Sequence, residues 1–72
     1  MPDGLSNKVR DFREARGWTQ AELAEHTGVS RKTINTVENS VFVPSVVVAR
    51  RIARALGQPV EALFELAGED RR

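Results

Sequence analysis

Histidine and cysteine, two residue types that often bind metals or act in catalysis, are nearly absent from this chain of 72 residues. It has one histidine, His26, and no cysteine. A metal site needs several ligands at short spacing, and His26 has no such second ligand, so it is expected at the surface or at a helix end. No nucleophile-base pair and no glycine-rich phosphate loop is present. The sequence therefore predicts no catalytic residue, no metal site and no cofactor, and indicates that the protein is not an enzyme.

The most informative stretch is residues 18–37, WTQAELAEHTGVSRKTINTV. Two helices that meet at a steep angle over a short turn bring their backbones close together, so the first helix needs a small residue at the contact, which Ala24 supplies. Gly28 is able to adopt a positive backbone angle, and Ile34 and Val37 fill the space between the helices. The stretch is therefore typical of two short helices joined by a sharp turn.

Residues that typically cap the ends of helices recur along the whole chain. Thr19 and Glu22 have the capping-box spacing, and Asn39 is suited to the left-handed conformation that ends a helix. The other expected N-caps are Ser6 or Asn7, Ser30 and Ser45. The expected helices are 6–16, 20–26, 31–39, a segment from Ser45 to Gly57, and a fifth that begins at Pro59. No stretch alternates with period two over enough residues for a sheet, so the predicted fold class is all-α, a compact bundle of five helices.

Length and composition limit the possible classes of protein. A chain of this size forms one domain, expected over residues 1–68, with a frayed tail at 69–72. The longest apolar run, residues 46–49, is too short to span a bilayer, and the N-terminus has no hydrophobic signal core, so a cytoplasmic protein is expected. The net charge of +1 does not by itself select nucleic acid as the partner.

The segment WTQAELAEHTGVSRKTINTVEN closely resembles the helix-turn-helix of the Cro-repressor/Xre-type family of bacterial and phage transcription regulators. The later segment PSVVVARRIARALGQPVEALFEL resembles the two helices that follow in that family, so the resemblance covers nearly the whole chain. It implies a lambda-repressor-like bundle that contains a helix-turn-helix and binds double-stranded DNA.

Helix 31–39 is the expected reading element. With Ile34 facing inward on a helical wheel, the opposite face is polar and has no carboxylate. In the major groove, Lys and Arg donate to guanine, Asn pairs with adenine, and a Thr methyl contacts thymine. The residues expected to read base edges are Lys32, Asn35 and Thr36, followed by Arg31 and Thr33.

The resemblance also implies roles outside this face. Thr19 and Gln20 match positions that contact the DNA backbone at a helix N-terminus, and Asn39 matches another phosphate contact. Glu38 lies near the inward face, where an acid is costly unless it is paired. Family members often pair this position with a basic residue of the first helix, and the matching residue here is Arg13. We therefore predict an Arg13–Glu38 ion pair.

Two features have alternative interpretations. The loop at 40–43, SVFV, departs from the glycine, lysine or polar residues common in the family, and its apolar side chains either pack on the core or join a subunit interface. These are Val41, Phe42 and Val43. The arginines of the fourth helix either form a basic edge near phosphate or simply face solvent. These are Arg50, Arg51 and Arg54.

One short helix offers few base contacts, and each good contact discriminates by only about 1–3 kcal/mol. We therefore expect a homodimer on a palindromic operator, with half-site centres about 10–10.5 base pairs apart. The candidate interface is the apolar C-terminal helix, with Val60, Leu63, Phe64 and Leu66. The predicted function is a sequence-specific DNA-binding transcriptional regulator. The alternative is an antitoxin or adaptor of the same fold whose main partner is a protein docked on the SVFV loop or the C-terminal helix.

Overall fold

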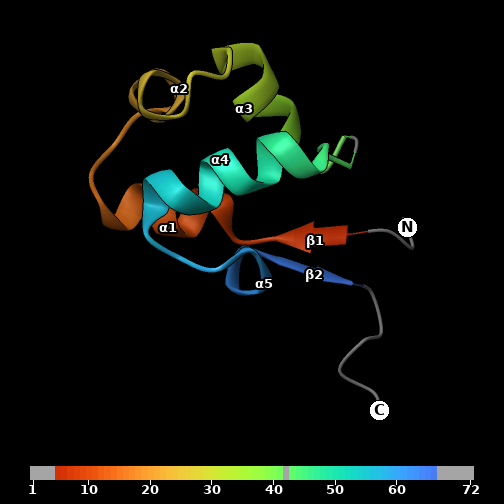
Figure 1. Cartoon of the computed structure of the whole chain (residues 1–72). Coiled ribbons are helices and arrows are strands. Elements are labelled where there is room, and N and C mark those ends of the chain that lie inside the picture. Colours follow the sequence, from red (N-terminus) through yellow and green to blue (C-terminus); the bar gives the residue numbers. More distant parts are fainter. Residues whose placement is uncertain (1–4, 42, 67–72) are drawn as a thin grey trace.

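The computed structural model describes residues 5–41 and 43–66. The elements are β1 (Leu5–Asn7), α1 (Val9–Ala15), α2 (Gln20–Thr27), α3 (Arg31–Glu38), α4 (Val46–Leu56), α5 (Val60–Leu63) and β2 (Phe64–Leu66). In Figure 1, α4 crosses the middle of the molecule, with α2 and α3 on one side of it and the two strands on the other. The predicted five-helix, all-α class is confirmed. Within these residues no helix has the length and apolar character needed to cross a membrane.

Side-chain caps set the starts of three helices. Thr19 Oγ1 accepts a hydrogen bond from the Glu22 amide at 3.1 Å, and Glu22 Oε1 accepts one from the Thr19 amide at 2.7 Å, which completes the predicted capping box. Ser30 and Ser45 accept from backbone amides in the first turns of α3 and α4, both at 3.1 Å. Each cap satisfies an amide that the helix itself leaves unbonded, and so fixes where α2, α3 and α4 begin.

The first helix starts later than predicted. Leu5–Asn7 is a strand, and α1 begins at Val9 after Lys8, which makes no side-chain cap. Asn7 has a different role. Its Oδ1 accepts from the Val9 amide at 3.1 Å, and its Nδ2 donates to the Val37 carbonyl at 2.9 Å. Asn7 therefore joins the start of α1 to the end of α3.

A two-stranded antiparallel ribbon, which the sequence analysis did not predict, pairs the two ends of the described chain. Leu5 is opposite Leu66 and Asn7 is opposite Phe64, in strands of three residues each. Strands this short show no period-two pattern in sequence. The ribbon also shortens the predicted C-terminal helix, because the chain becomes extended after Leu63.

The core collects side chains from all five helices. The fully buried ones are Val9, Leu23, Ile34, Val37, Ile52, Leu56 and Leu63. Leu63 is only 1% exposed and Phe64 only 8%, so both belong to this core. They were expected at a dimer surface, and their burial corrects that expectation, because a side chain packed inside the subunit offers no area to a second copy. Val60 is half-buried, and the Leu66 side chain lies outside the described part.

The turn between α2 and α3 has the expected geometry. Gly28 has φ of +74°, and its amide donates to the Ala24 carbonyl at 2.9 Å. Ala24 packs, partly buried, against the core. A Cβ at Gly28 would lie 3.1 Å from Arg51 Nη1, so both the backbone angle and the space favour glycine here.

The end of α3 differs from prediction. Asn39 has φ of −90° and ψ of 6°, which is not left-handed, and the left-handed residue is Ser40, with φ of +57°. Asn39 keeps a helix-like backbone because both its amide and its side-chain Nδ2 donate to the Asn35 carbonyl, at 3.1 and 3.0 Å. The chain therefore turns one residue later than expected.

Candidate nucleic-acid interface

The outer face of α3 carries the residues predicted to read bases. Arg31, Lys32 and Asn35 are exposed, and together with Gln20 of α2 they line a shallow cavity of about 450 Å³. Thr33 and Thr36 are half-buried. The fold thus brings three of the residues predicted to read bases together, beside Gln20, which is predicted to contact the DNA backbone.

The two threonine hydroxyls are partly used within α3. Thr33 Oγ1 accepts from Ser30 Oγ at 2.9 Å, and Thr36 Oγ1 donates to the Thr33 carbonyl at 2.9 Å. Thr33 therefore keeps its hydroxyl proton for a ligand, whereas Thr36 offers lone pairs and its methyl group.

This face is electropositive. Among the residues that the structure describes, no carboxylate lies within 4 Å of the charged atoms of Arg31 or Lys32. Glu38, the one acid in α3, has a side chain with no exposed surface. Positive side chains without local neutralisation attract an anionic partner such as a phosphate backbone.

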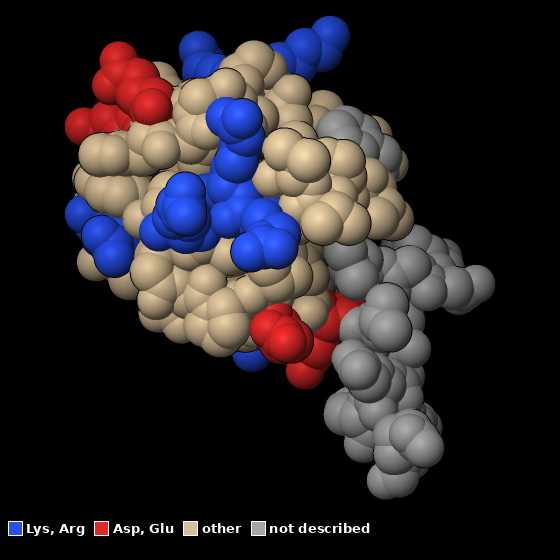
Figure 2. Space-filling model, viewed as in Figure 1, with Lys and Arg blue, Asp and Glu red and all other residues tan. Residues whose placement is uncertain are grey.

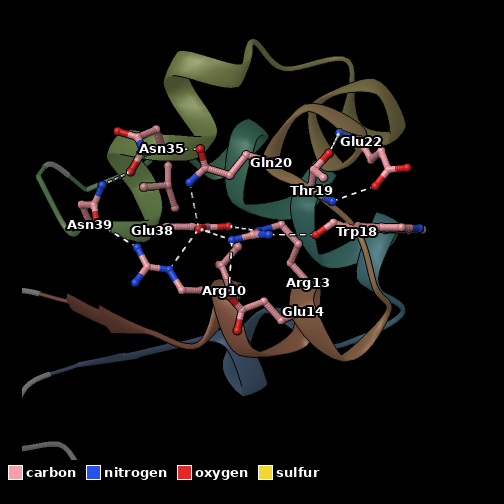
Figure 3. A network of polar contacts seen from close by, with 12 residues as sticks. Arg10, Arg13, Glu14, Trp18, Thr19, Gln20, Glu22, Asn35, Glu38 and Asn39 are labelled. Carbon is pink, nitrogen blue, oxygen red and sulfur yellow. Dashed lines mark hydrogen bonds and ion pairs between the residues drawn. The ribbon is translucent and has the colours of Figure 1, made fainter.

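The predicted Arg13–Glu38 ion pair is present under the α3 face, and Figure 3 shows Glu38 where α1, α2 and α3 converge. Arg13 Nε lies 2.6 Å from Glu38 Oε2, and Arg13 Nη2 lies 3.0 Å from Oε1. Arg13 Nη1 also donates to the Trp18 carbonyl at 2.8 Å. The pair therefore fixes α1 against α3 and holds the segment that leads into α2.

The pKa of the Glu38 carboxyl is lowered by this environment. Burial alone would raise that pKa, but hydrogen bonds from Arg13 and Gln20, the Arg13 charge and a hydrogen bond from Arg10 together hold it below its usual value. The hydrogen bond to Glu38 raises the pKa of Arg13. Both groups are therefore charged at neutral pH, and Glu38 is only an acceptor of hydrogen bonds.

Two partners of Glu38 were missed in the sequence. Gln20 Nε2 donates to Glu38 Oε1 at 3.1 Å, and Arg10 Nε lies 3.4 Å from the same oxygen. Arg10 is three residues before Arg13, a spacing that places both on one side of α1, so its proximity was readable in principle. The Gln20 contact was not, because it depends on how α2 packs against α3.

The polar contacts continue from Glu38 to the surface (Figure 3). Asn35 Nδ2 lies 3.4 Å from Gln20 Oε1, and Asn39 Nδ2 donates to the Asn35 carbonyl. Arg10 Nη2 donates to Asn39 Oδ1 at 2.9 Å, which completes a ring of contacts back to Glu38. We call this set the Glu38 network, and its members are Arg10, Arg13, Gln20, Asn35, Glu38 and Asn39.

The residues predicted to contact the DNA backbone, Thr19, Gln20 and Asn39, lie at the start of α2 and at the end of α3. Thr19 is exposed at the start of α2, where the first amides of the helix are not bonded within it. Asn39 is exposed at the end of α3. Gln20 and Asn39 both contact Asn35, so a predicted base-reading residue lies between two predicted backbone contacts.

The aromatic pair at the α1–α2 junction has a packing role. Trp18 is half-buried against the core, and its ring stacks on exposed His26 with centroids 4.1 Å apart. The Arg16 guanidinium lies 5.0 Å from the Trp18 ring centroid. His26 therefore sits near the end of α2 at the surface, as predicted, and no metal-ligand cluster occurs in the described ranges.

The loop before α4 is more exposed than it would be if its apolar side chains packed on the core. Val41 is 67% exposed and Val43 is 65% exposed, so neither packs on the core, and Phe42 lies outside the described residues. Val46 and Val47 are also exposed, at 74% and 61%. Four exposed valines thus occur within seven positions.

Arginines gather on α4. Figure 2 shows lysine and arginine side chains over the middle of the molecule, where α4 lies. Arg50, Arg51 and Arg54 border a groove of about 500 Å³ with Val47 and Val60. Arg51 Nη1 lies 3.3 Å from the Thr27 carbonyl and so also ties α4 to the end of α2.

Comparison with known proteins agrees with this geometry. A helix-turn-helix family model matches residues 9–63. An HTH-type transcriptional regulator of Methanothermobacter thermautotrophicus is 48% identical over 59 residues, which cover 81% of this chain and 86% of the relative. Antitoxin HipB of Escherichia coli is 34% identical over 55 residues, 76% of this chain and 58% of HipB. The crystal structure of the restriction-modification controller protein C.AhdI of Aeromonas hydrophila superposes with a TM-score of 0.73 at 29% identity, over 76% of this chain and 83% of that one.

The fold and the matched range define a helix-turn-helix domain, with α2 and α3 as its two helices. The chain belongs to the Xre-type, lambda-repressor-like family of helix-turn-helix transcriptional regulators, as its sequence resemblance indicated.

Proposed function

We propose that this protein is a sequence-specific regulator that binds double-stranded DNA with α3 in the major groove. The observation that carries the proposal is the exposed face where Arg31, Lys32 and Asn35 lie beside Gln20. In the described part of the chain, no carboxylate lies within 4 Å of the charged atoms of Arg31 or Lys32. Donors and acceptors of this kind match those that base pairs present in the major groove. The family supports the same reading, because its members are DNA-binding regulators.

In this proposal the α3 residues have distinct roles. Lys32 and Arg31 donate to guanine N7 and O6, Asn35 pairs with adenine, and the methyl groups of Thr36 and Thr33 contact thymine. The two threonines reach less far, because both are half-buried. We therefore place the strongest base discrimination at Lys32 and Asn35.

The backbone contacts set the register of α3 in the groove. Thr19 and Gln20 meet phosphates through side chains and the first amides of α2, and Asn39 does so at the other end of α3. Arg10 adds a cation beside Asn39, to which it donates at 2.9 Å. Contacts of this class weaken as salt increases, since each releases counterions from the DNA.

The regulator acts as a homodimer on a palindromic operator in this proposal, because a single α3 makes too few contacts for useful specificity. The available apolar surface differs from the one expected from sequence, since Leu63 and Phe64 are buried. Val60 remains half-buried, and Val46 and Val47 are exposed on α4. We place the contact between copies on these valines.

Selection of bound sequences from a random duplex pool tests the proposal. The expected result is an inverted repeat with half-site centres about 10–10.5 base pairs apart. Affinity for the selected duplex should then fall steeply between low and moderate salt. Recovery of no preferred sequence, at protein concentrations that retain folded protein, would reject the proposed function.

A second candidate is an antitoxin whose main partner is a protein, favoured by the similarity to HipB. In that case the exposed valines Val41, Val43, Val46 and Val47 would bind the partner. The two functions separate in one comparison. A stoichiometric complex with a co-expressed neighbouring gene product, disrupted by Val47→Asp, supports the antitoxin, whereas an inverted repeat bound by purified protein alone supports the regulator.

A further inference from the structure

We infer that Gln20 is a positioning residue that sets the orientation of the Asn35 amide, so that Asn35 reads adenine. The inference rests on the proposed function, in which Asn35 faces a base. It gives Gln20 a role in sequence preference, whereas a residue that only contacts the DNA backbone carries no sequence information.

The buried carboxylate determines which end of the Gln20 amide faces inward. Glu38 is ionised and paired with Arg13, so its Oε1 only accepts hydrogen bonds. Gln20 presents its amide group to this oxygen at 3.1 Å. An amide oxygen there would face a negative charge, so the Nε2 group must face Glu38, and Gln20 Oε1 must point away from it.

The same reasoning then fixes Asn35. Gln20 Oε1 lies 3.4 Å from the Asn35 amide group, and because that oxygen only accepts, the facing group must be Nδ2 (Figure 3). A distance of 3.4 Å is long for a hydrogen bond, so the contact selects between two orientations more than it adds stability. The orientation of an exposed side chain is thereby determined by a buried charge.

The orientation leaves a defined pair of groups for a ligand. Nδ2 has two hydrogens, of which one faces Gln20, so a second hydrogen and Oδ1 remain. In the major groove, adenine presents the N7 acceptor beside the N6 donor, which matches one donor and one acceptor. Guanine presents two acceptors there, which a donor-acceptor pair does not match. An Asn35 amide held in this orientation by Gln20 therefore favours adenine.

Gln20→Lys is the variant that separates this role from backbone contact. The lysine ammonium still donates to Glu38 and still attracts phosphate, but it has no acceptor for the Asn35 amide. We propose to measure dissociation constants by fluorescence anisotropy for the wild type, Gln20→Lys, Asn35→Ala and the double variant. The probes are the duplex obtained by selection and its single base-pair variants across one half-site. Circular dichroism melts check that each variant is folded.

The expected wild-type result is a preference of about 5- to 150-fold for adenine at one position, which Asn35→Ala abolishes. Gln20→Lys should reduce the adenine preference at that same position several-fold, and the preference of the double variant should match that of Asn35→Ala. The preference is a ratio of dissociation constants for two duplexes, so a change in the phosphate contact at position 20, which acts on all duplexes alike, cancels from it. The base preferences of Gln20→Lys at the other positions of the half-site should stay within about twofold of the wild-type values. Lys32→Ala should change the base preference at a different position.

The inference is overturned if Gln20→Lys leaves the adenine preference unchanged, or if the base that depends on Asn35 is not adenine. Either outcome leaves the proposed function intact, because the wild type still selects a sequence. If the wild type shows no preference at any position, the proposed function itself fails, and the inference fails with it.

Discussion

Arg13 and Glu38 lie 25 residues apart in sequence and are joined by two hydrogen bonds, Nε to Oε2 at 2.6 Å and Nη2 to Oε1 at 3.0 Å. The Glu38 side chain has no exposed surface and that of Arg13 has 10%. The pair therefore stands in the interior, where a single remaining charge is far more costly than the intact pair.

Removal of one partner should destabilise the fold strongly. Arg13→Met and Glu38→Met are each expected to lower the free energy of unfolding by about 3–5 kcal/mol, because each removes the partner that makes two hydrogen bonds to a buried charge. In Arg13→Met, Glu38 keeps only the longer contact with Arg10, at 3.4 Å, and the hydrogen bond from Gln20. Urea unfolding followed by the fluorescence of Trp18, the one tryptophan, measures this. The double variant Arg13→Met with Glu38→Met should lose less than either single variant. A double-variant loss equal to the sum of the two single losses would show that the pair does not act as a unit.

Stability should also depend on the charge of Glu38. The folded-state pKa of Glu38 is below its ordinary value of 4.5, so the unfolded chain binds the proton more readily. The resulting stabilisation is present above about pH 4.5 and is lost as the pH falls through the lower, folded-state value.

Unfolding measured between pH 3 and pH 6 checks this dependence. The slope of stability against pH should become smaller in Glu38→Gln, whereas Glu25→Gln, which changes an exposed carboxylate on α2, serves as the matched control. A full wild-type slope in Glu38→Gln would assign the acid sensitivity to other groups.

Gly28 offers a test of the turn between α2 and α3. Gly28→Ala is expected to cost about 1–2 kcal/mol, because φ is +74° and alanine disfavours that angle. Gly17 has the same φ, but a Cβ there would contact nothing within 4 Å, so Gly17→Ala reports the backbone cost alone.

The excess cost of Gly28→Ala over Gly17→Ala should come from Arg51, whose Nη1 would lie 3.1 Å from the new Cβ. In an Arg51→Ala background the two glycine substitutions should therefore cost about the same. Thermal unfolding resolves such differences, since 1 kcal/mol shifts Tm by roughly 4–8 °C in a domain of this size. An excess that persists without Arg51 would point to strain elsewhere in the turn.

The local features of the fold were predictable because they depend on residues close in sequence. Thr19 and Glu22 are three positions apart, and their spacing alone indicates the capping box that the structure contains. The Arg13–Glu38 pair was predictable for another reason: the family resemblance aligned both positions. Neither prediction required knowledge of how α2 packs.

The features that were missed depend on distant packing. The ribbon pairs Leu5 with Leu66, and three-residue strands leave no pattern to read. The contact from Gln20 to Glu38 appears only when α2 is placed against α3. The burial of Leu63 and Phe64 was missed for the same reason, because an apolar face in sequence does not say whether the core or a partner covers it.

The central claim, that the exposed face of α3 reads bases in the major groove, is tested most directly by removing major-groove acceptors from the DNA. Replacement of single purines in the selected duplex by their 7-deaza analogues deletes N7 and leaves Watson–Crick pairing and the minor groove intact. At the positions whose preference depends on Lys32 or Asn35, this change should weaken wild-type binding by about 1–3 kcal/mol and should not weaken the corresponding alanine variant further. Equal effects on wild type and variants, or no effect at any purine, would contradict the claim.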